Sequence, residues 1–251
     1  MANASLSRQF ASWAAKLRYE DLSPAVIDKI KGLLLHALAG AALGLSKSRA
    51  RDTVRHTLRE EGKVDGATIF ADGGKATRMG AAYVNAELIR ESQLVDSYRM
   101  LTHPGSVLVP AAMAHAELEG RSGRELITGL AAGYEFMLRL CDEFIPATAA
   151  RGFRPSPVYC TMGGALAGGK VMGLDEDGLV AAIALAANFA SGITEAPRSG
   201  GNDSSIHEPH AARNGVFAAL VASQGHIKGA ELALEGRAGF YNAFIGNDRG
   251  E

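Results

Sequence analysis

The stretch Pro157-Val-Tyr-Cys-Thr-Met-Gly-Gly-Ala-Leu-Ala-Gly-Gly-Lys-Val-Met172, with Gly173 after it, decides the fold class of this chain. Its apolar residues recur at helical spacing, and glycine is the residue that most often follows the last turn of a helix. Four glycines inside the stretch carry no side chain: Gly163, Gly164, Gly168 and Gly169. Small residues let neighbouring helices approach closely. The stretch therefore predicts a helix that packs tightly against others.

The same stretch also matches the spacing G-x4-G-K between Gly164 and Lys170. A phosphate-binding loop of this kind needs Ser or Thr after the lysine and a strand before the first glycine. Val171 follows the lysine, and the surroundings are helical in pattern. No GxGxxG motif follows a strand either, so neither nucleotide nor dinucleotide binding is predicted.

On both sides of this helix in the sequence, residues typical of helix ends predict further helices. Ser23-Pro24 is an N-cap followed by proline, and Ser122-Gly-Arg-Glu125 is a capping box. A strand signal is confined to residues 67–70. The helices expected in this way span residues 24–45, 48–60, 74–90, 104–119, 122–144, 157–172, 175–191 and 209–224, with two shorter pieces after them. No interdomain linker or repeat is visible, so we expect one all-α domain over residues 1–251.

Composition and charge exclude several classes of protein. The 251 residues carry 26 Lys+Arg and 27 Asp+Glu, a net charge of −1, whereas nucleic-acid or anionic-membrane binders need a basic excess. Residues 1–8 contain no secretory signal, and no apolar run is long enough to span a membrane. Cys141 and Cys160 form no CxxC pair, so we expect buried thiols in a reducing compartment. These features predict a soluble, cytoplasmic protein.

Two polar loops interrupt the helical pattern, at residues 96–105 and 199–210, and each leads into a helix. A third polar segment, residues 151–156, also precedes a helix and contributes Arg151 and Arg154. Loops held on a rigid scaffold are where binding and catalytic residues are usually found. We therefore look for chemistry in these three segments.

His103 lies in the first loop, at a helix entrance and seven residues after Asp96. A carboxylate that orients an imidazole, beside a hydroxyl such as that of Ser97 or Thr102, is an arrangement suited to acid–base catalysis. The helix opened by Pro104 would offer free N–H groups to a substrate carboxylate. A capping or structural role for His103 is the alternative.

The other candidates each have a structural alternative. Arg151 and Arg154 can clamp a carboxylate or form a solvated surface, and Tyr159 can donate a proton or pack in the core. His207 and His210 are three residues apart, but no carboxylate or thiol pattern completes a metal site. We expect no metal.

Taken together, the motifs resemble those of the MmgE/PrpD family, which includes 2-methylcitrate dehydratase, cis-aconitate decarboxylase and an iminodisuccinate epimerase. The resemblance rests on order and spacing over about residues 20–245. The matching stretches are Ala81-Ala-Tyr-Val-Asn-Ala86, Asp96-Ser97, Thr102-His-Pro-Gly-Ser106, Pro110-Ala-Ala112, Gly152-Phe153, Thr161-Met-Gly-Gly-Ala165, Gly173-Leu-Asp-Glu176, His207, Ala211-Ala-Arg-Asn-Gly215 and Gly239-Phe-Tyr-Asn-Ala-Phe244.

The resemblance implies a mostly helical domain, a homodimer, and no iron–sulfur cluster or other cofactor. It also implies that a proton moves at a carbon next to a carboxylate of a small di- or tricarboxylate. That step then leads to loss of water, loss of carbon dioxide or inversion.

Several positions depart from the family pattern. Asp96 is the only acid before its loop serine, because Gln93 and Val95 stand where the family usually has acids. Arg154 replaces a histidine, and Ser204 stands in place of a lysine ahead of His207.

Family members also continue into a second, α+β lid domain, and this sequence stops at Glu251, about where that domain would begin. Three interpretations follow. The chain is half of a split enzyme with a separate lid-domain subunit, a stand-alone helical domain with another reaction, or a non-catalytic binding protein.

The sequence favours a cofactor-independent lyase or isomerase that transfers a proton next to a carboxylate or carbonyl of a small carboxylic acid, by dehydration, decarboxylation, epimerisation or cyclisation. His103 is the predicted general acid or base, and Asp96 orients it. The remaining predicted site residues are His207 as a second acid or base, Tyr159 as a supporting donor, and Ser97, Arg154, Thr102 and Ser204 as substrate ligands. The alternative is a non-catalytic scaffold or a substrate-binding half of a split enzyme.

Overall fold

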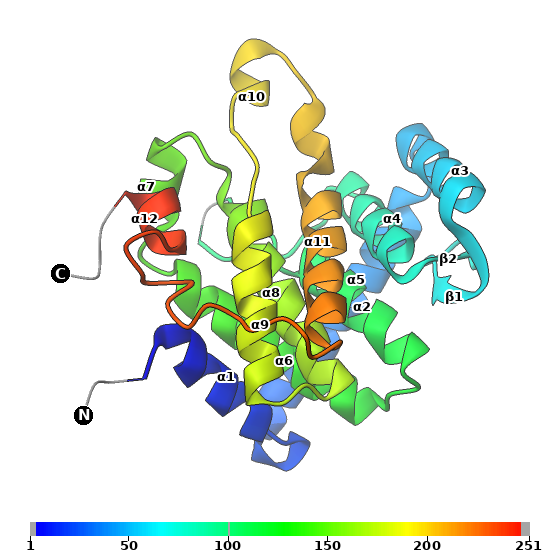
Figure 1. Cartoon of the computed structure of the whole chain (residues 1–251). Helices are drawn as coiled ribbons and strands as arrows, with labels where there is room; N and C mark the ends of the chain where they lie inside the picture. Colours follow the sequence, from blue (N-terminus) through cyan, green and yellow to red (C-terminus); the bar gives the residue numbers. More distant parts are fainter. Residues whose placement is uncertain (1–3, 100, 247–251) are drawn as a thin grey trace.

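Helix α8 (Pro155–Met172) lies in the middle of the helical bundle, and every residue from 155 to 169 is buried. Four helices pack around it: α5 (Gly105–Leu118), α6 (Gly123–Cys141), α9 (Glu176–Phe189) and α11 (His207–Ala222). Figure 1 shows α8, α9 and α11 side by side at the centre of the molecule. In this computed structural model, residues 4–99 and 101–246 are described. Residues 1–3, Met100 and 247–251 of the expected domain lie outside them.

Glycines let these helices approach as closely as the sequence predicts. A Cβ at Gly133 of α6 would lie 2.6 Å from the Cβ of Ala167 on α8. A Cβ at Gly215 of α11 would lie 3.1 Å from the carbonyl oxygen of Thr161 on the same central helix. The 2.6 Å contact at Gly133 could not form without a shift of α6 or α8, and the 3.1 Å contact at Gly215 would be tighter than most Cβ contacts, so both interfaces favour glycine.

The remaining helices surround this centre. Their bounds are Leu6–Lys16 (α1), Pro24–Gly44 (α2), Ser48–Glu61 (α3), Arg78–Glu91 (α4), Ile145–Ala150 (α7), Ala196–Ser199 (α10) and Phe240–Ile245 (α12), with 3-10 turns at Tyr19–Asp21 and Asp203–Ile206. The side chain of Ser23 caps α2 at the N–H of Val26, and both halves of the capping box at Ser122 and Glu125 are formed. The predicted all-α class is confirmed.

Two predicted boundaries are wrong because a short hairpin forms before α4. Strand β1 (Gly62–Thr68) pairs antiparallel with β2 (Lys75–Ala76). The helix predicted from residue 74 therefore begins only at Arg78, where the Thr77 side chain caps the N–H of Gly80. The strand signal at residues 67–70 overlaps β1 only in its first two residues.

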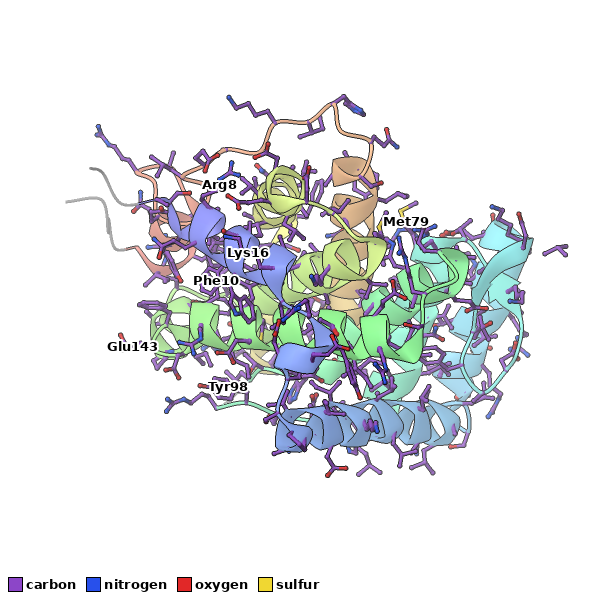
Figure 2. All side chains as sticks on the ribbon, turned by 90° about the horizontal axis from the view of Figure 1, so that it is seen from below. Arg8, Phe10, Lys16, Met79, Tyr98 and Glu143 are labelled. Carbon is purple, nitrogen blue, oxygen red and sulfur yellow. The ribbon has the colours of Figure 1, made fainter. Side chains whose placement is uncertain are left out.

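Other differences lie at the ends of helices. The helix predicted over residues 122–144 ends at Cys141, and α7 follows it as a separate helix. Helix α1 was not predicted, and of the two pieces expected after α11 only α12 is an α-helix in the described part. In Figure 2, Phe10 reaches from α1 toward α6, where its ring meets Phe136 edge to face at 4.8 Å.

Helix α11 begins at His207, two residues earlier than predicted. Its amino-terminal end lies at the side of the bundle where α10 and the following 3-10 turn project beyond the other helices (Figure 1). His207 and Glu208 therefore belong to the first helical turn and are fixed by it, rather than to a loose loop. Among the described helices, none is both long enough and apolar enough to cross a membrane.

Candidate active site

A small pocket of about 60 Å³ lies where α4, α5, α8 and α11 meet the predicted loops. Its lining residues are Arg90, Gln93, Val95, His103, Ser106, Arg154 and Glu208. A larger hollow of about 530 Å³ lies beside α1, but residues such as Phe10, Trp13 and Leu17 line it and His103 does not. The small pocket is the candidate site because two of the residues predicted from the sequence, His103 and Arg154, line it.

His103 lies in the loop two residues before the start of α5, and its side chain lines the pocket. Its Nδ1 lies 3.0 Å from the main-chain carbonyl oxygen of Asp96, and its own N–H donates to Ser156 Oγ at 3.1 Å. A carbonyl oxygen only accepts, so Nδ1 carries the proton and Nε2 is the nitrogen with a free lone pair. The side chain is partly buried. This is the tautomer that a histidine base requires.

The carboxylate of Asp96 does not contact this imidazole, contrary to the predicted pair. It accepts hydrogen bonds from the N–H of Gly105, at 2.8 and 3.0 Å, and from the hydroxyl of Tyr134 at 2.8 Å. Asp96 thus caps the positive end of α5 and orients His103 through its backbone. The helix N-terminus that was expected to receive a substrate carboxylate is already occupied by this side chain. Burial and the Asp96 charge together raise the pKa of Tyr134 well above its ordinary value, so its hydroxyl remains a donor.

Glu208 holds two arginines at the opposite side of the pocket. Arg154 Nη1 lies 2.8 Å from Oε2 of the Glu208 carboxylate, and Arg154 Nη2 lies 2.7 Å from Oε1. Arg90 Nε lies 3.3 Å from Oε2. The Glu208 side chain is 1% exposed, against 16% for Arg154 and 22% for Arg90. Burial alone would raise the pKa of Glu208, but Arg154 and then Arg90 outweigh it, and the pKa lies below its ordinary value. The buried carboxylate is therefore charged.

The backbone of Arg154 is anchored as well as its guanidinium. Its N–H donates to the carbonyl of Gly192 at 2.9 Å, and the N–H of Thr194 donates to Gly152 at 2.9 Å. Phe153 and Ile193 form a β-bridge between the same two segments. The segment before α8 is thereby fixed against the segment after α9, which places the Arg154 side chain at the pocket.

His207 lies close by but does not line the pocket. It is 9% exposed, and its Nδ1 is buried with no hydrogen-bond partner among the described residues. Its ring packs against Gly192, where an added Cβ would lie 3.5 Å from Cγ and Cε1. Burial and the Arg154 charge lower its pKa, so the ring is neutral at pH 7. The structure does not bring His207 and His103 into one pocket.

Ser97 and Thr102 shape the loop before His103 instead of facing the pocket. The Thr102 hydroxyl is fully buried and donates to the carbonyl of Tyr98, and Ser97 donates to the carbonyl of Thr102 at 3.2 Å. Tyr98 in turn donates to Asp142 at the end of α6, at 2.6 Å (Figure 2). Both hydroxyls donate to backbone carbonyls and neither residue lines the pocket, so their role as substrate ligands stays a prediction.

Tyr159 and Ser204 also fall outside the pocket. Tyr159 is fully buried, its hydroxyl pairs with Thr148 Oγ1 at 2.7 Å, and its ring meets Phe240 edge to face. Burial raises its pKa further. Ser204 lies in the 3-10 turn before α11, partly buried. The core alternative therefore holds for Tyr159, and neither residue is placed to touch a substrate in this pocket.

Five of the seven pocket residues were not predicted as site residues: Arg90, Gln93, Val95, Ser106 and Glu208. Arg90 lies in the last turn of α4, Glu208 follows His207, and Gln93 stood out only as a departure from a family pattern. Gln93 has a positive φ of 61°, a conformation that is strained for this residue, and its side-chain amide donates to the carbonyl of Arg90 at 3.1 Å. No sequence signal links an arginine to a glutamate 54 residues away, so only the fold reveals the Arg154–Glu208 pair.

The structure offers no donor set for a metal. Within residues 4–99 and 101–246, no three His, Cys, Asp or Glu side chains gather as a metal site would need. Both cysteines are buried and free, and burial raises the pKa of Cys141 to about 12 and that of Cys160 as well. Thiols of this kind are inert.

Known proteins resemble this chain over nearly its whole length. A cis-aconitate decarboxylase of Aspergillus terreus is 27% identical over 99% of the chain and 52% of its own length. The cis-aconitate decarboxylases of Homo sapiens and Mus musculus are 28% and 26% identical, over 97% of the chain and 51% and 50% of their own lengths. The chain thus spans about half the length of the curated relatives it matches.

A protein-family model also matches the chain. The family model for the MmgE/PrpD N-terminal domain covers residues 8–251. The stretches on which the resemblance was based, including the loop of His103 and the glycines of α8, lie within that range. The chain belongs to the MmgE/PrpD family.

Proposed function

We propose that the chain catalyses proton transfer at a carbon next to a carboxylate or carbonyl of a small carboxylic acid, as the helical half of a lyase or isomerase. The observation that carries this proposal is the fixed tautomer of His103 in a pocket with two arginines. Relatives named cis-aconitate decarboxylase support the lyase class. Decarboxylation is the outcome we favour among dehydration, decarboxylation, epimerisation and cyclisation.

In the proposed reaction His103 transfers the proton, and Arg154 and Arg90 stabilise the negative charge. In the favoured decarboxylation the bond to the departing carboxylate breaks, carbon dioxide leaves, and the electron pair shifts through the adjacent double bond, so that the imidazolium form of His103 donates its Nε2 proton to the carbon at the far end and regains a proton from solvent. In epimerisation or dehydration the neutral ring would instead accept a proton from the substrate carbon at Nε2. Negative charge then develops on the substrate carboxylate, and the guanidinium groups of Arg154 and Arg90 stabilise it. This route uses no cofactor. His207 stays in the proposal as a second acid or base, although the pocket as observed does not include it.

Solvent deuterium exchange tests the proposal. The purified chain is incubated in D₂O with cis-aconitate, citrate and an iminodiacid, and carbon-bound deuterium is followed by NMR. The variant H103Q should lose about 10²–10⁴-fold in exchange rate, the usual contribution of a positioned acid or base. H226Q, at an exposed position after α11, is the matched control. Full exchange in H103Q would refute the assignment of His103.

A non-catalytic scaffold is the second candidate. The sharing of Arg154 and Arg90 with the buried Glu208 favours it, because stably paired guanidinium groups also serve structure. A scaffold would bind carboxylates without any wild-type exchange. The exchange experiment therefore separates the two functions.

A homodimer is part of the proposal, and one face of α2 supports it. Leu35 and Leu43 are 69% and 51% exposed, and Gly32 and Ala39 share that surface. Figure 2 shows α2 along one edge of the molecule. L35E should halve the mass observed by sedimentation, whereas V64E, at the 96% exposed Val64 of β1, should not. A monomeric wild-type chain would refute this.

A covering lid, contributed by a separate subunit, is the last part of the proposal. Four exposed aliphatic side chains belong to the segments that carry pocket residues or pair with them: Leu94, Leu101, Ile193 and Ile206, with exposures of 53%, 45%, 57% and 47%. Leu94 lies between Gln93 and Val95, Leu101 and Ile206 lie two residues before His103 and Glu208, and Ile193 forms a β-bridge with Phe153. Such a rim suits a protein surface more than water. Amides of residues 192–206 should then exchange hydrogen more slowly in the native assembly than in the purified chain, and equal rates would contradict the lid.

A further inference from the structure

We infer that the pocket is a subsite for a single carboxylate, and that Glu208 sets its charge and holds its two arginines. This inference deepens the proposed function and rests on it, because it names the part of the substrate that the pocket recognises. It concerns residues that depart from the family pattern, since Arg154 stands where a histidine is usual.

The charges that line the pocket leave room for one negative group. Arg90 and Arg154 supply two positive charges and Glu208 supplies one negative charge, a net of plus one. Glu91 also accepts from Arg90 at 3.2 Å, but it lies outside the pocket and is 3.7 Å from Arg49, which shares its charge. A monoanion balances the lining groups, whereas a dianion would exceed them.

The size of the pocket agrees with its charge. At about 60 Å³ the pocket is far smaller than the hollows of about 430 and 630 Å³ elsewhere on the described surface, and its size suits a group such as a carboxylate. The other polar groups are already engaged, because Ser106 donates to the carbonyl of His103 at 2.7 Å and the Gln93 amide donates to Arg90. The free donors in the pocket therefore belong to the guanidinium groups.

Glu208 cannot leave this arrangement as a surface carboxylate would. It is 1% exposed, it stands on the first turn of α11, and both of its oxygens face arginine nitrogens. A guanidinium has five N–H donors in a rigid fork, so the two nitrogens bound to Glu208 orient the donors that remain. Glu208 is in this sense a positioning residue that does not touch the substrate.

The test uses anions that differ in number of carboxylates and in charge. Protein with ¹⁵N-labelled arginine is titrated with acetate, succinate and tricarballylate, and the Nε–H signals of Arg154 and Arg90 are followed by NMR. The three dissociation constants should agree within about threefold, because each added carboxylate that met a further cation would improve affinity about tenfold or more. R154K should weaken acetate binding about tenfold, and R151K should not, since Arg151 does not line the pocket and its guanidinium donates to the carbonyl of Ala243. Tricarballylate binding tenfold tighter than acetate would overturn the inference.

A comparison of the affinities for sulfate, a dianion, and acetate, a monoanion, tests the role of Glu208. The wild type should bind sulfate no more tightly than acetate, and E208Q should shift the ratio about tenfold toward sulfate because the lining then carries two positive charges. E208D keeps the charge and should keep the wild-type ratio. A purely structural Glu208 would weaken both anions equally in E208Q, and an unchanged ratio would overturn its assigned role. Should E208Q not fold, E208D and the wild-type titrations still decide.

The binding experiments are independent of turnover. One-carboxylate binding without deuterium exchange would refute the proposed function and leave the subsite. Exchange without this anion selectivity would refute the subsite and leave the proposed function.

Discussion

The imidazole of His103 is bonded to the main-chain carbonyl of Asp96, 3.0 Å from Nδ1, and not to its carboxylate. The carboxylate instead accepts from Gly105 and Tyr134 at the start of α5. One residue thus performs two separable tasks, because any side chain at position 96 would retain the carbonyl that fixes the histidine tautomer.

Replacement of Asp96 by asparagine separates these tasks. D96N loses a charged cap at a helix N-terminus, which should lower the free energy of unfolding by about 1–2 kcal/mol. The exchange rate should fall by less than about tenfold, far less than the effect of H103Q, because the carbonyl bonded to Nδ1 remains. Urea unfolding and the deuterium assay measure the two effects on one preparation. A loss of exchange as large as that of H103Q would show that the carboxylate itself takes part.

Glu208 predicts a loss of stability in acid. Its pKa in the folded chain lies below the ordinary value of 4.5, so the ionised form stabilises the fold above that pH. Stability from this group is lost as pH falls from 4.5 through the folded pKa. Urea unfolding between pH 7 and pH 3 should show a steeper decline in the wild type than in E208Q in this range.

E208Q should also be less stable than the wild type at pH 7. It removes the charge partner of Arg154 and leaves Arg90 paired with Glu91 alone, and breaking a buried pair costs about 3–5 kcal/mol. E20Q is the control, because Glu20 pairs with Arg124 at an exposed site. Parallel pH profiles for E208Q and the wild type would contradict an ionised Glu208.

The sequence predicted the helices where local signals agree with packing. Ser23-Pro24 and the Ser122–Glu125 box opened helices as expected, and the glycines of α8 lie at close contacts with α6 and α11. The start of α4 was misplaced because the pairing of β2 with β1 joins residues seven or more positions apart, such as Thr68 with Lys75 and Gly62 with Ala76. Short-range patterns do not contain that contact.

The candidate site was predictable only in part, for the same reason. His103 and Arg154 line the pocket, because loops that enter helices at one end of a bundle converge. Tyr159, Thr102 and Ser97 carry suitable groups, but their hydroxyls are used by Thr148 or by backbone carbonyls. Whether a hydroxyl is free depends on tertiary partners, which residue type does not reveal. The Glu208 clamp has the same long-range character.

Two glycine substitutions test the packing of the bundle. G133A would place a Cβ 2.6 Å from that of Ala167 and 2.8 Å from the carbonyl of Gly163, and overpacking of this kind costs about 1–3 kcal/mol. G123A is the matched control: Gly123 is exposed at the start of the same helix, α6, with no atom within 4 Å of an added Cβ. It should gain about 0.5–1 kcal/mol from reduced freedom of the unfolded chain. Thermal unfolding should move in opposite directions for the two variants, and a stabilised G133A would contradict the close approach of α6 and α8.

His115 provides a second, distinct acid sensitivity. The ring is fully buried on α5, Arg78 lies 2.8 Å from its Nδ1, and its Nε2 has no hydrogen-bond partner in the described part of the chain. Burial first, and then the Arg78 charge, lower its pKa from 6.5 to about 3. The unfolded chain binds this proton more readily than the folded one, so stability from His115 is full above pH 6.5 and is lost as pH falls toward 3.

The slope of the free energy of unfolding against pH identifies His115 as the group that titrates. Each pH unit below 6.5 should cost up to about 1.4 kcal/mol while only the unfolded state is protonated at His115. H115Q should be less stable than the wild type at pH 7, because the substitution disturbs a packed site. Its free energy of unfolding should nevertheless depend less on pH between pH 6 and pH 5, where Glu208 does not yet titrate. H226Q, at an exposed position after α11, should keep the wild-type slope. A wild-type slope in H115Q would mean that another histidine, of which buried His207 is the first to examine by H207Q, binds the proton on unfolding.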